Sequence, residues 1–530
     1  MVGISLCMIV RDEAAHLEKT LECFRPWVDE ICIVDTGSTD DTIQVARAAG
    51  ATVGFHPWDD DFAAARNASL ALATQEWILV ADADEQLTAG SGPLLKPSIA
   101  SANGAALLVR IENPTIGQAG SWYSVPRLIK NHPAIRFRRR VHESVMPSLL
   151  EAGLDELGTS NISLEHRGYA VRSELERKRE RNIRLLRLAQ ADDPEDLFAI
   201  YKLAVSLVRP DQRTERIAAL ERARQLARCL SPAERDTHPY LPLIHDVLAA
   251  TLSSMGQLSA ALNVTREALK LHPKTPELIL RLAHLERRAG QVEHAEGSLV
   301  AFADARPSEV RAQSRAGLRR LALLERGHIA RLQGDGAEAA RYARQSVELD
   351  PHDVTARRFE AELALDANGT SAATDSTVGA FLKDFGPERE SWIVGGRVAL
   401  LTGDVTTALT LFRSAAASSE VGMEATARLA IAELAGGDLS RTKAHHAALR
   451  GTDLESEAAR VVLGVIAGER LDVDSAFDRI LLLSAMVPWL EQLVVAPVDL
   501  AATTFQKNAP RYRDVVPRID ELLVHAGDSQ

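Results

Sequence analysis

The stretch WILVADADEQL, from Trp77 to Leu87, joins an apolar run directly to three carboxylates. Its first four residues have the unbroken apolar character of a strand that is buried on both faces. Asp82 and Asp84 follow, and because side chains two residues apart on a strand point the same way, they share a face. Neighbouring carboxylates repel each other unless a cation compensates them, and oxygen-rich sites suit Mg²⁺ or Mn²⁺. The pattern therefore predicts a divalent-cation site, with a polar strand cap as the alternative.

The segments before this stretch alternate between strands and helices. ISLCMIV (Ile4–Val10), EICIVD (Glu30–Asp35) and ATVGF (residues 51–55) are short apolar runs, and helical periodicity separates them. This alternation is typical of a parallel sheet with helices on both faces. We therefore expect a Rossmann-like α/β domain with a mostly parallel sheet over residues 1–168. Such sheets bind ligands at the carboxyl ends of their strands, where the aspartates lie.

After residue 168 helical periodicity replaces the strand pattern, and pairs of Gly and Pro 17 residues apart recur within it. These pairs are Gly256 with Pro273, Gly290 with Pro307, and Gly334 with Pro351. The first two glycines are 34 residues apart, a period typical of tetratricopeptide repeats. The pattern predicts a helical repeat domain over residues 236–530, with linking helices over residues 169–235 that complete the first module. An irregular helical array is the alternative.

Composition excludes several classes of protein. The 530 residues are 46% hydrophobic, which is too apolar for a mainly disordered chain. The net charge of −12 gives no electrostatic reason to expect a nucleic-acid partner. Four cysteines without a CxxC pair favour a reducing compartment. Because no run approaches about 18 apolar residues and no basic leader is evident, we expect a cytoplasmic protein with no membrane span.

Two other segments carry groups suited to an anionic ligand. IVDTGSTDDT (Ile33–Thr42) ends a strand at Asp35 and then starts a helix, whose exposed N–H groups can hold an anion. Asp35 is placed to accept a hydrogen bond from a sugar or base hydroxyl, although the segment would equally serve as a simple helix cap. WDDDFAAARNASL (Trp58–Leu70) carries Arg66, which suits a diphosphate but could equally be a solvated helix charge.

In chain order, SLCMIVRDE (Ser5–Glu13), IVDTGSTDDT, WDDDFAAARNASL and WILVADADE resemble the motifs of family 2 glycosyltransferases with the GT-A fold. The branch that fits carries a helical repeat tail and is similar to peptide S-glycosyltransferases of the sublancin type. RFRRRVHESV (Arg136–Val145) and LEHRGYAVRSELERKRERNIRLL (Leu164–Leu186) also match that branch. The resemblance covers roughly residues 3–205, and beyond them only the repeat architecture matches.

The resemblance assigns roles to four residues near the strand ends. It implies that Asp35 binds the nucleoside of a nucleotide-sugar and that Arg66 lies near the nucleotide or its diphosphate. It further implies that Asp82 contacts the ribose side. Asp84 would then be the direct ligand of the divalent cation, Mg²⁺ or Mn²⁺.

The chain departs from the family pattern at two points. The branch has Asn-Glu-Glu after the first strand, where this chain has Asp12, Glu13 and Ala14. Glu13 stays assigned to donor binding, but the departure weakens base recognition by this segment. The Arg-Trp signature of processive polysaccharide synthases is absent, which favours a single transfer over polymerisation.

Inversion at the anomeric carbon, which the resemblance implies, needs a general base that takes the acceptor proton. Glu143 is the first candidate, because the neighbouring His142 is suited to hold it ionised. Glu85 is the second candidate, and His142 itself is the third.

His166, in LEHRGY, is a candidate additional ligand of the metal or of the diphosphate. Arg167 and Tyr169 accompany it as candidate phosphate contacts. A lone histidine is more often a structural hydrogen-bonding residue, so that alternative stays open.

Together these features lead us to expect a metal-dependent, inverting family 2 glycosyltransferase, a hexosyltransferase that uses a UDP-sugar donor. Repeat solenoids present grooves suited to extended peptides, so the expected acceptor is a peptide or protein side chain presented by the repeats. A homodimer interface or simple stabilisation is the alternative role of the repeats. The alternative for the whole chain is a non-catalytic repeat scaffold whose first domain only binds a nucleotide-sugar.

Overall fold

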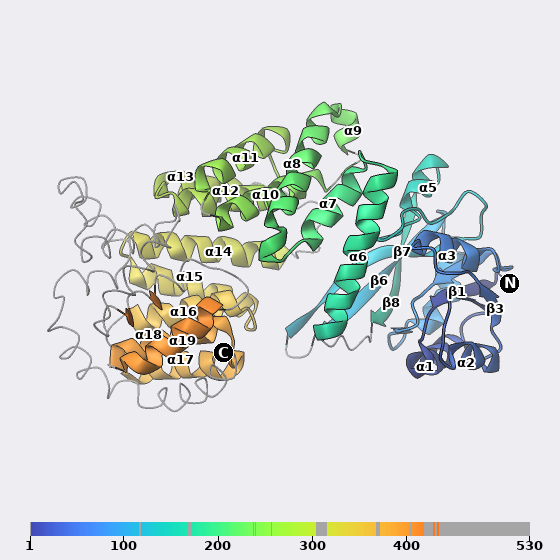
Figure 1. Ribbon diagram of the computed structural model, residues 1–530, viewed down its shortest axis with the longest axis horizontal. Coiled ribbons are helices and arrows are strands. Elements are labelled where there is room, and N and C mark those ends of the chain that lie inside the picture. Colours follow the sequence, from blue (N-terminus) through green and yellow to red (C-terminus); the bar gives the residue numbers. More distant parts are fainter. Residues whose placement is uncertain are drawn as a thin grey trace. The chain divides into compact units, whose positions relative to one another are not determined.

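The computed structural model divides the chain into two compact units, Met1–Leu207 and Val208–Gln530 (Figure 1). The first unit is α/β and the described part of the second is all-α, which confirms the expected fold class. The expected domain limits at residues 168 and 235 stay a prediction. The structure describes residues 2–115, 118–166, 172–236, 238, 240–255, 257–303, 315–366, 371–402, 404–417, 428–429 and 432–433.

The described residues of the first unit form an eight-stranded sheet in the order β3-β2-β1-β4-β7-β6-β8-β5. Neighbouring strands are parallel from β3 to β4, whereas β7 is antiparallel to both β4 and β6. The sheet is therefore parallel in its first half and mixed in its second half. The strands are β1 (Ile4–Val10), β2 (Glu30–Asp35), β3 (Thr52–Phe55), β4 (Trp77–Val80), β5 (Glu85–Leu87), β6 (Ala106–Thr115), β7 (Gln118–Lys130) and β8 (Leu157–His166).

Helices connect the parallel strands, because a crossover between parallel strands needs a long connection. In α1 the apolar residues Leu17, Leu21 and Phe24 recur every four and three positions, and this stripe is buried in the same core as β1. The apolar runs of the parallel strands are buried for this reason. The helices of the first unit are α1 (Ala14–Phe24), α2 (Thr42–Ala48), α3 (Phe62–Leu70), the 3-10 turn η1 (Gly92–Leu94), α4 (Leu95–Ala100), α5 (Met146–Glu151), α6 (Arg172–Asp192) and α7 (Leu197–Ser206).

The strand register brings the polar segments of the sequence to one edge of the sheet. Val10, at the end of β1, is paired with Asp35, at the end of β2. Cys7 of β1 is paired with Val80, the last residue of β4. The segments that leave β1, β2 and β4 therefore start from the same edge, as expected for ligand sites of parallel sheets.

The acidic stretch after β4 connects the centre of the sheet to its far edge. It passes into β5, which is antiparallel to β8, with Glu85 paired to His166. Asp84 directly precedes this pair and so comes next to the end of β8. The pairing of β5 with β8 thus brings together Asp84 and His166, which are 82 residues apart in the sequence.

The described part of the second unit consists of helices that pack in consecutive pairs, such as α10 with α11, α12 with α13, and α14 with α15. The alanines five residues after the repeat glycines, Ala261, Ala295 and Ala339, are fully buried. Gly290 and Gly334 have positive φ at the turns between helices. The repeat architecture is confirmed, although Gly256 and Pro307 lie outside the described residues. The bounds are η2 (Pro210–Gln212), α8 (Arg213–Cys229), α9 (Pro232–Asp236), α10 (Leu241–Ser254), α11 (Leu258–Leu271), α12 (Pro276–Arg288), α13 (Val292–Ala303), α14 (Arg315–Leu332), α15 (Gly336–Leu349), α16 (Val354–Asp366), α17 (Ser371–Phe385), α18 (Arg389–Thr402) and α19 (Val405–Ala417).

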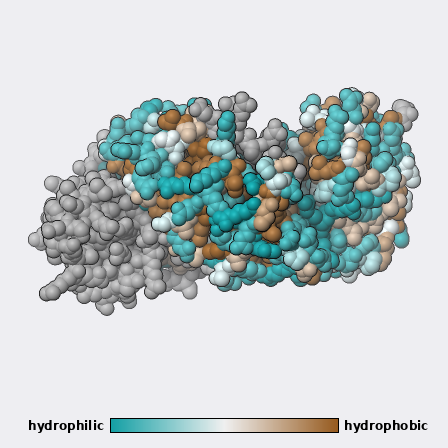
Figure 2. Space-filling model, turned by 90° about the horizontal axis from the view of Figure 1, so that it is seen from above, coloured by the Kyte–Doolittle hydropathy of each residue, from teal (hydrophilic) through white to brown (hydrophobic). Residues whose placement is uncertain are grey.

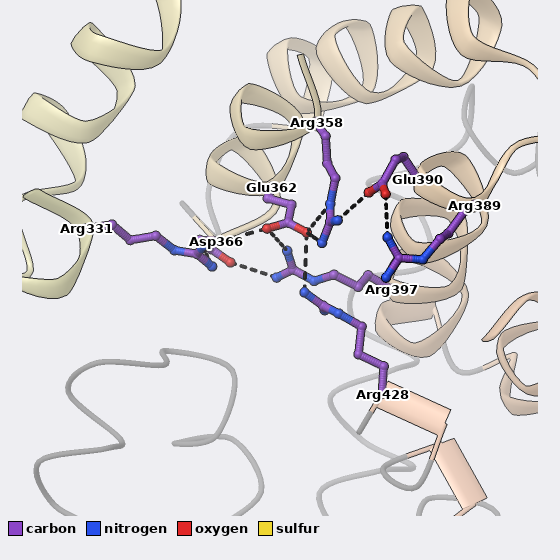
Figure 3. A network of polar contacts seen from close by, with 8 residues as sticks. All are labelled: Arg331, Arg358, Glu362, Asp366, Arg389, Glu390, Arg397 and Arg428. Atoms are coloured by element: carbon purple, nitrogen blue, oxygen red, sulfur yellow. Dashed lines mark hydrogen bonds and ion pairs between the residues drawn. The ribbon is translucent and has the colours of Figure 1, made fainter. Parts of the chain in front are cut away.

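A buried network of charges links three of these helices (Figure 3). Glu362 of α16 accepts a hydrogen bond from Arg358 at 2.9 Å and another from Arg428 at 3.3 Å. Asp366, one turn further, pairs with Arg331 of α14 at 2.6 Å and with Arg397 of α18 at 2.7 Å. Burial favours the neutral form of Glu362, but the surrounding arginines outweigh it and hold its pKa well below the usual value. The network therefore fixes which helix faces meet.

The surface of the described residues mixes polar and apolar side chains. On the face in Figure 2, hydrophilic residues alternate with smaller apolar areas. The most exposed large apolar residues, Phe55, Leu150 and Val300, lie on separate elements, as single exposed apolar residues commonly do. Within the described ranges, every helix is too short or too polar to cross a bilayer.

Candidate active site

A cavity of about 1150 Å³ opens at the carboxyl edge of the sheet, within the first unit. Its floor comes from the ends of β1 and β4 and from β7, and its walls come from the segment 137–145 and from α6 and α7. Asp82, Asp84, Arg66, Glu143 and His166, which the sequence singled out from distant motifs, all line it. The fold therefore brings most of the expected site residues together.

Two arginines hold Asp82 in place. Arg66 Nη2 donates to Asp82 Oδ1 at 2.6 Å, and Arg127 Nη2 donates to Asp82 Oδ2 at 3.1 Å. Burial favours the neutral form of Asp82, but the two guanidinium groups outweigh it and lower its pKa. Asp82 is thus a carboxylate whose two oxygens already have cationic partners.

Arg66 joins Asp82 to the candidate base. It lies on α3, which begins after Asp61, whose side chain accepts from Ala64 N and so caps the helix. Its Nε donates to Glu143 Oε1 at 2.7 Å, while its Nη1 is buried without a hydrogen-bond partner among the described residues. Burial opposes the charge of Arg66, but Asp82 and Glu143 raise its pKa above the usual value. Arg66 is therefore a structural bridge inside the site rather than a solvated helix charge.

Asp84 and His166 form a separate pair at the edge of the cavity. Asp84 Oδ2 lies 2.9 Å from His166 Nε2, and both side chains keep some exposure, 20% for Asp84 and 35% for His166. The hydrogen bond that His166 Nε2 donates to the Asp84 carboxylate raises the pKa of His166, although burial opposes this. His166 is thus in contact with the expected metal ligand.

The Asp84–His166 pair fits a divalent cation only as part of a ligand set. The pair would offer a cation one carboxylate oxygen and one ring nitrogen, from Asp84 and His166 at 2.9 Å from each other. Among the described residues no cluster of three or more His, Cys, Asp or Glu side chains forms a complete metal site. The protein could therefore hold Mg²⁺ or Mn²⁺ together with waters and phosphate oxygens, which these ions commonly retain.

The three candidate bases differ in their access to the cavity. Glu143 lines it, with Arg66 on one of its oxygens. Glu85 is 2% exposed, accepts from Asp82 N at 2.9 Å and pairs with Arg127 at 3.1 Å, so it lies behind the cavity wall. His142 lines the cavity with a positive φ of 54°, and burial with nearby Lys202 lowers its pKa to about 4. The geometry favours Glu143 as the base.

Asp35 is held by the turn that follows β2, and its assignment to donor binding stays a prediction. It is buried at the end of β2, and its carboxylate accepts from Gly37 N at 2.9 Å and from Ser38 N at 3.1 Å. It closes the turn that carries Thr39, whose N–H donates to Asp12 Oδ1 at 2.7 Å. The described cavity lining includes Thr36 but not Asp35, so the geometry favours a turn-closing role for Asp35.

Glu13 and its neighbour Asp12 both line the cavity. Glu13 N donates to Thr42 Oγ1 at 2.8 Å, which ties the start of α1 to the start of α2. Its assignment to donor binding stays a prediction. Arg167 and Tyr169 lie outside the described residues.

Comparison with known proteins identifies the family of this chain. The family model Glycosyl transferase family 2 matches residues 5–139. A TPR repeat-containing protein of Synechococcus elongatus is 35% identical over 302 residues, which are 55% of this chain and 73% of that protein.

The chain belongs to glycosyltransferase family 2. The SPbeta prophage-derived glycosyltransferase SunS of Bacillus subtilis is 28% identical over 205 residues, which are 37% of this chain and 47% of SunS. Among solved structures, glucosyl-3-phosphoglycerate synthase from Mycobacterium tuberculosis, in complex with Mn²⁺, uridine diphosphate and glucosyl-3-phosphoglycerate, is 20% identical with a TM-score of 0.25. That match covers 33% of this chain and 75% of the synthase chain. The enzyme class expected from the motifs is confirmed.

Sequence reasoning missed Arg127 of this glycosyltransferase. Arg127 lies on β7 and touches both Asp82 and Glu85 because β7 pairs with β4, through Leu79 and Leu128. No local pattern in SVPRLIK indicated this role, since an arginine in an alternating strand is usually solvated. Only the antiparallel pairing, across about 45 residues of sequence, places it under the acidic stretch.

Proposed function

We propose that this family 2 glycosyltransferase is metal-dependent, inverts at the anomeric carbon, and moves a sugar from a UDP-sugar to a side chain of a peptide or protein. The observation that carries the proposal is the Asp84–His166 pair at 2.9 Å on the edge of a cavity that Glu143 also lines. The Asp84–His166 pair can hold a cation that neutralises the leaving group, and Glu143 can take the proton of the acceptor. A single displacement needs both.

Asp84 and His166 would hold the cation, with Mg²⁺ or Mn²⁺ as the ions that suit them. When bound, such a cation neutralises the charge that develops on the departing nucleoside diphosphate. Asp82 is not free for the same task, because Arg66 and Arg127 already occupy its two oxygens. Asp82 would instead hold Arg66 in place.

Glu143 would take the proton from the acceptor hydroxyl, thiol or amide. Arg66 donates to one of its oxygens at 2.7 Å and so fixes the direction of the other. A base held in one orientation removes a proton without first losing rotational freedom. Inversion follows when the acceptor atom attacks as the diphosphate leaves from the opposite face of the sugar.

Repeats of the second unit support a peptide or protein acceptor. Stacked helix pairs form extended surfaces that suit extended chains, whereas small acceptors need no such surface. The alternative role of the repeats, formation of a homodimer, would leave the transfer chemistry unchanged.

The test measures UDP release and sugar transfer from several UDP-sugars, with Mn²⁺ and with EDTA, by the wild-type chain, Asp84→Asn and Asp41→Asn. Asp41 is an exposed carboxylate outside the cavity lining and serves as the matched control. We expect Mn²⁺-dependent release that Asp84→Asn lowers by at least about 100-fold and Asp41→Asn leaves intact. Release that is equal in EDTA, or unaffected by Asp84→Asn, would refute the metal assignment.

A further inference from the structure

Two helices give the cavity a wall with an excess of positive charge. Arg177, Lys178 and Arg181 of α6 line the cavity, and the spacing of 177 and 181 places them on one helix face. Lys202 of α7 lines it as well. Every charged residue that α6 and α7 contribute to the described lining is therefore a cation.

Packing fixes this wall against the rest of the site. Ile183 and Leu186 of α6 and Leu203 of α7 share a buried apolar cluster with Val141, and Phe62 packs against this cluster. Val141 directly precedes the two candidate bases His142 and Glu143 in the chain. The cations of both helices are therefore held on the side of the cavity where the acceptor proton is taken.

Arg181 and Lys202 lack the carboxylate partners that other cations of the first unit have among the described residues. Arg181 donates to the Asn182 amide oxygen at 3.2 Å and lies over the Phe62 ring, at 4.8 Å from its centroid. Lys202 Nζ lies 5.3 Å from the centroid of the Phe198 ring. In the part of the chain that the structure describes, neither Arg181 nor Lys202 forms an ion pair with a carboxylate.

Two arginines near this wall but outside its cations are paired with carboxylates. Arg184, one turn after Arg181 on α6, forms a salt bridge with Asp60 at 2.5 Å. Arg140 forms one with Asp192 at 2.6 Å. Arg181 and Lys202 therefore differ from Arg184 and Arg140 in having no carboxylate partner among the described residues.

The carboxylates of the cavity form their ion pairs with other residues, although the charge of Glu143 reaches Arg181 and opposes the lowering of its pKa by burial. Asp82 is held by two arginines, Glu143 by Arg66, and Asp84 by His166. Burial lowers the pKa of Lys202, and Arg139 lowers it further. Lys202 in turn contributes to the lowered pKa of His142, which directly precedes the candidate base Glu143.

We propose that the wall formed by Arg181 and Lys202 is an acceptor subsite that binds an acidic peptide, with carboxylates beside the modified residue placed on these two cations. The inference rests on the proposed function, since it names the class of acceptor. Charge complementarity of this kind selects partners and suppresses neutral or basic competitors. Under the proposed function, the diphosphate of the donor is held at Asp84 and His166 rather than at Arg181 and Lys202.

Binding is the first test, because it needs no turnover. Two pools of fluorescent peptides carry Ser, Thr, Cys and Asn, flanked by Asp and Glu in one pool and by Gln and Gly in the other. Anisotropy with the full chain, Mn²⁺ and UDP should show tighter binding of the acidic pool. Arg181→Gln and Lys202→Gln should each weaken it about tenfold, as expected for loss of one charged hydrogen bond. Lys202→Arg should restore most of the affinity.

Arg179→Gln is the matched control. Arg179 is an exposed arginine on the same helix, outside the cavity lining, and its substitution should leave peptide binding unchanged. Equal binding of both pools by the wild-type chain would overturn the inference. Variants that weaken UDP binding but not peptide binding would also overturn it, because the cations would then hold the diphosphate. A third contrary outcome is an oligonucleotide that displaces the labelled acidic pool at a lower concentration than unlabelled acidic peptide does.

UDP release separates this inference from the proposed function. Metal-dependent release together with no preference for acidic peptides would refute the inference and leave the transferase proposal intact. Binding of the acidic pool that depends on Lys202, without any UDP release, would support the subsite and refute the transferase proposal.

Discussion

Arg66 is the residue on which the two halves of the site depend. Its guanidinium donates to Asp82 through one nitrogen and to Glu143 through another, at 2.6 and 2.7 Å. The planar guanidinium of arginine carries several donors in fixed directions and can hold two carboxylates at once, whereas the ammonium of lysine is a single point charge. The distance between the acidic stretch and the base is therefore set by one side chain.

We predict that Arg66→Lys weakens both the site and the fold. A lysine cannot hold both carboxylates, so one of them stays buried without its partner, at a cost of about 3 kcal/mol of unfolding free energy. Transfer should fall about 100-fold, because the base is displaced. Urea unfolding and kcat measurements check this against Arg138→Lys, whose exposed pair with Glu151 should be dispensable. Unchanged kcat in Arg66→Lys would contradict the bridging role.

Glu143→Gln tests the base while preserving the site geometry. The amide oxygen can still accept from Arg66 Nε, but the amide cannot take a proton. We expect kcat for transfer to fall by about 100- to 10,000-fold with little change in the KM for the donor. If transfer persists and His142→Gln abolishes it instead, the base is the histidine.

At the scale of elements, the short strand β5 decides where Asp84 and His166 meet. β5 is antiparallel to β8 and connects directly to the stretch after β4. The sheet edge therefore brings Asp84 and His166 to 2.9 Å. Strands of three residues contribute little stability, so this one acts by position.

The buried charge network acts at the same scale in the repeats (Figure 3). Glu362 of α16 is surrounded by Arg331, Arg358, Arg397 and Arg428. Several of these arginines also have other partners, but Glu362 is the carboxylate that they share. Loss of its charge would leave neighbouring guanidinium groups to repel each other.

We predict that Glu362→Gln destabilises the repeats by about 3 kcal/mol, because it leaves buried arginines without their shared counter-charge. The control is Glu338→Gln, since Glu338 pairs with Arg341 on an exposed face of α15 and should be dispensable. Thermal and urea unfolding followed by circular dichroism give both values. An equal effect of the two substitutions would show that the network does not stabilise the stack.

At the scale of the whole molecule, the roles of the two units can be tested separately. The described cavity lining falls entirely within Met1–Leu207. A fragment of residues 1–207 should therefore fold, bind UDP with Mn²⁺ and release UDP from a UDP-sugar. It should lose transfer to a peptide that the repeats present. Full peptide transfer by this fragment would assign the repeats another role, such as dimer formation.

Acid should destabilise the repeats through His328. Burial, and then the charge of Arg287, lower its pKa from 6.5 to about 3. The unfolded chain therefore binds the proton between these values and the folded chain does not, so stability falls as pH drops below 6.5. His328→Gln should reduce the loss between pH 7 and pH 5 by up to about 2 kcal/mol in urea unfolding. An identical pH slope in both proteins would refute this.

Much of the first unit was predictable because its signals are local. Apolar runs such as Ile4–Val10 and the helical stripe of α1 follow from periodicities of two and about 3.6 residues, which a short window reveals. The position of Asp84 at the ligand-binding edge followed from the rule that parallel strands bind ligands at their carboxyl ends, whereas Arg66 was placed there by the family resemblance. His166 was reached only through the family resemblance.

The sequence by itself determined the order of elements, the repeat period and the carboxylates that follow β4, because each is written within a few residues of chain. Only the tertiary structure decided that Arg127 reaches Asp82, that Asp35 closes a turn, and that Lys202 faces the cavity without a carboxylate partner among the described residues. These outcomes depend on antiparallel pairing and helix packing between distant segments. The free energy of such contacts is shared among many side chains, so no single stretch of sequence encodes it.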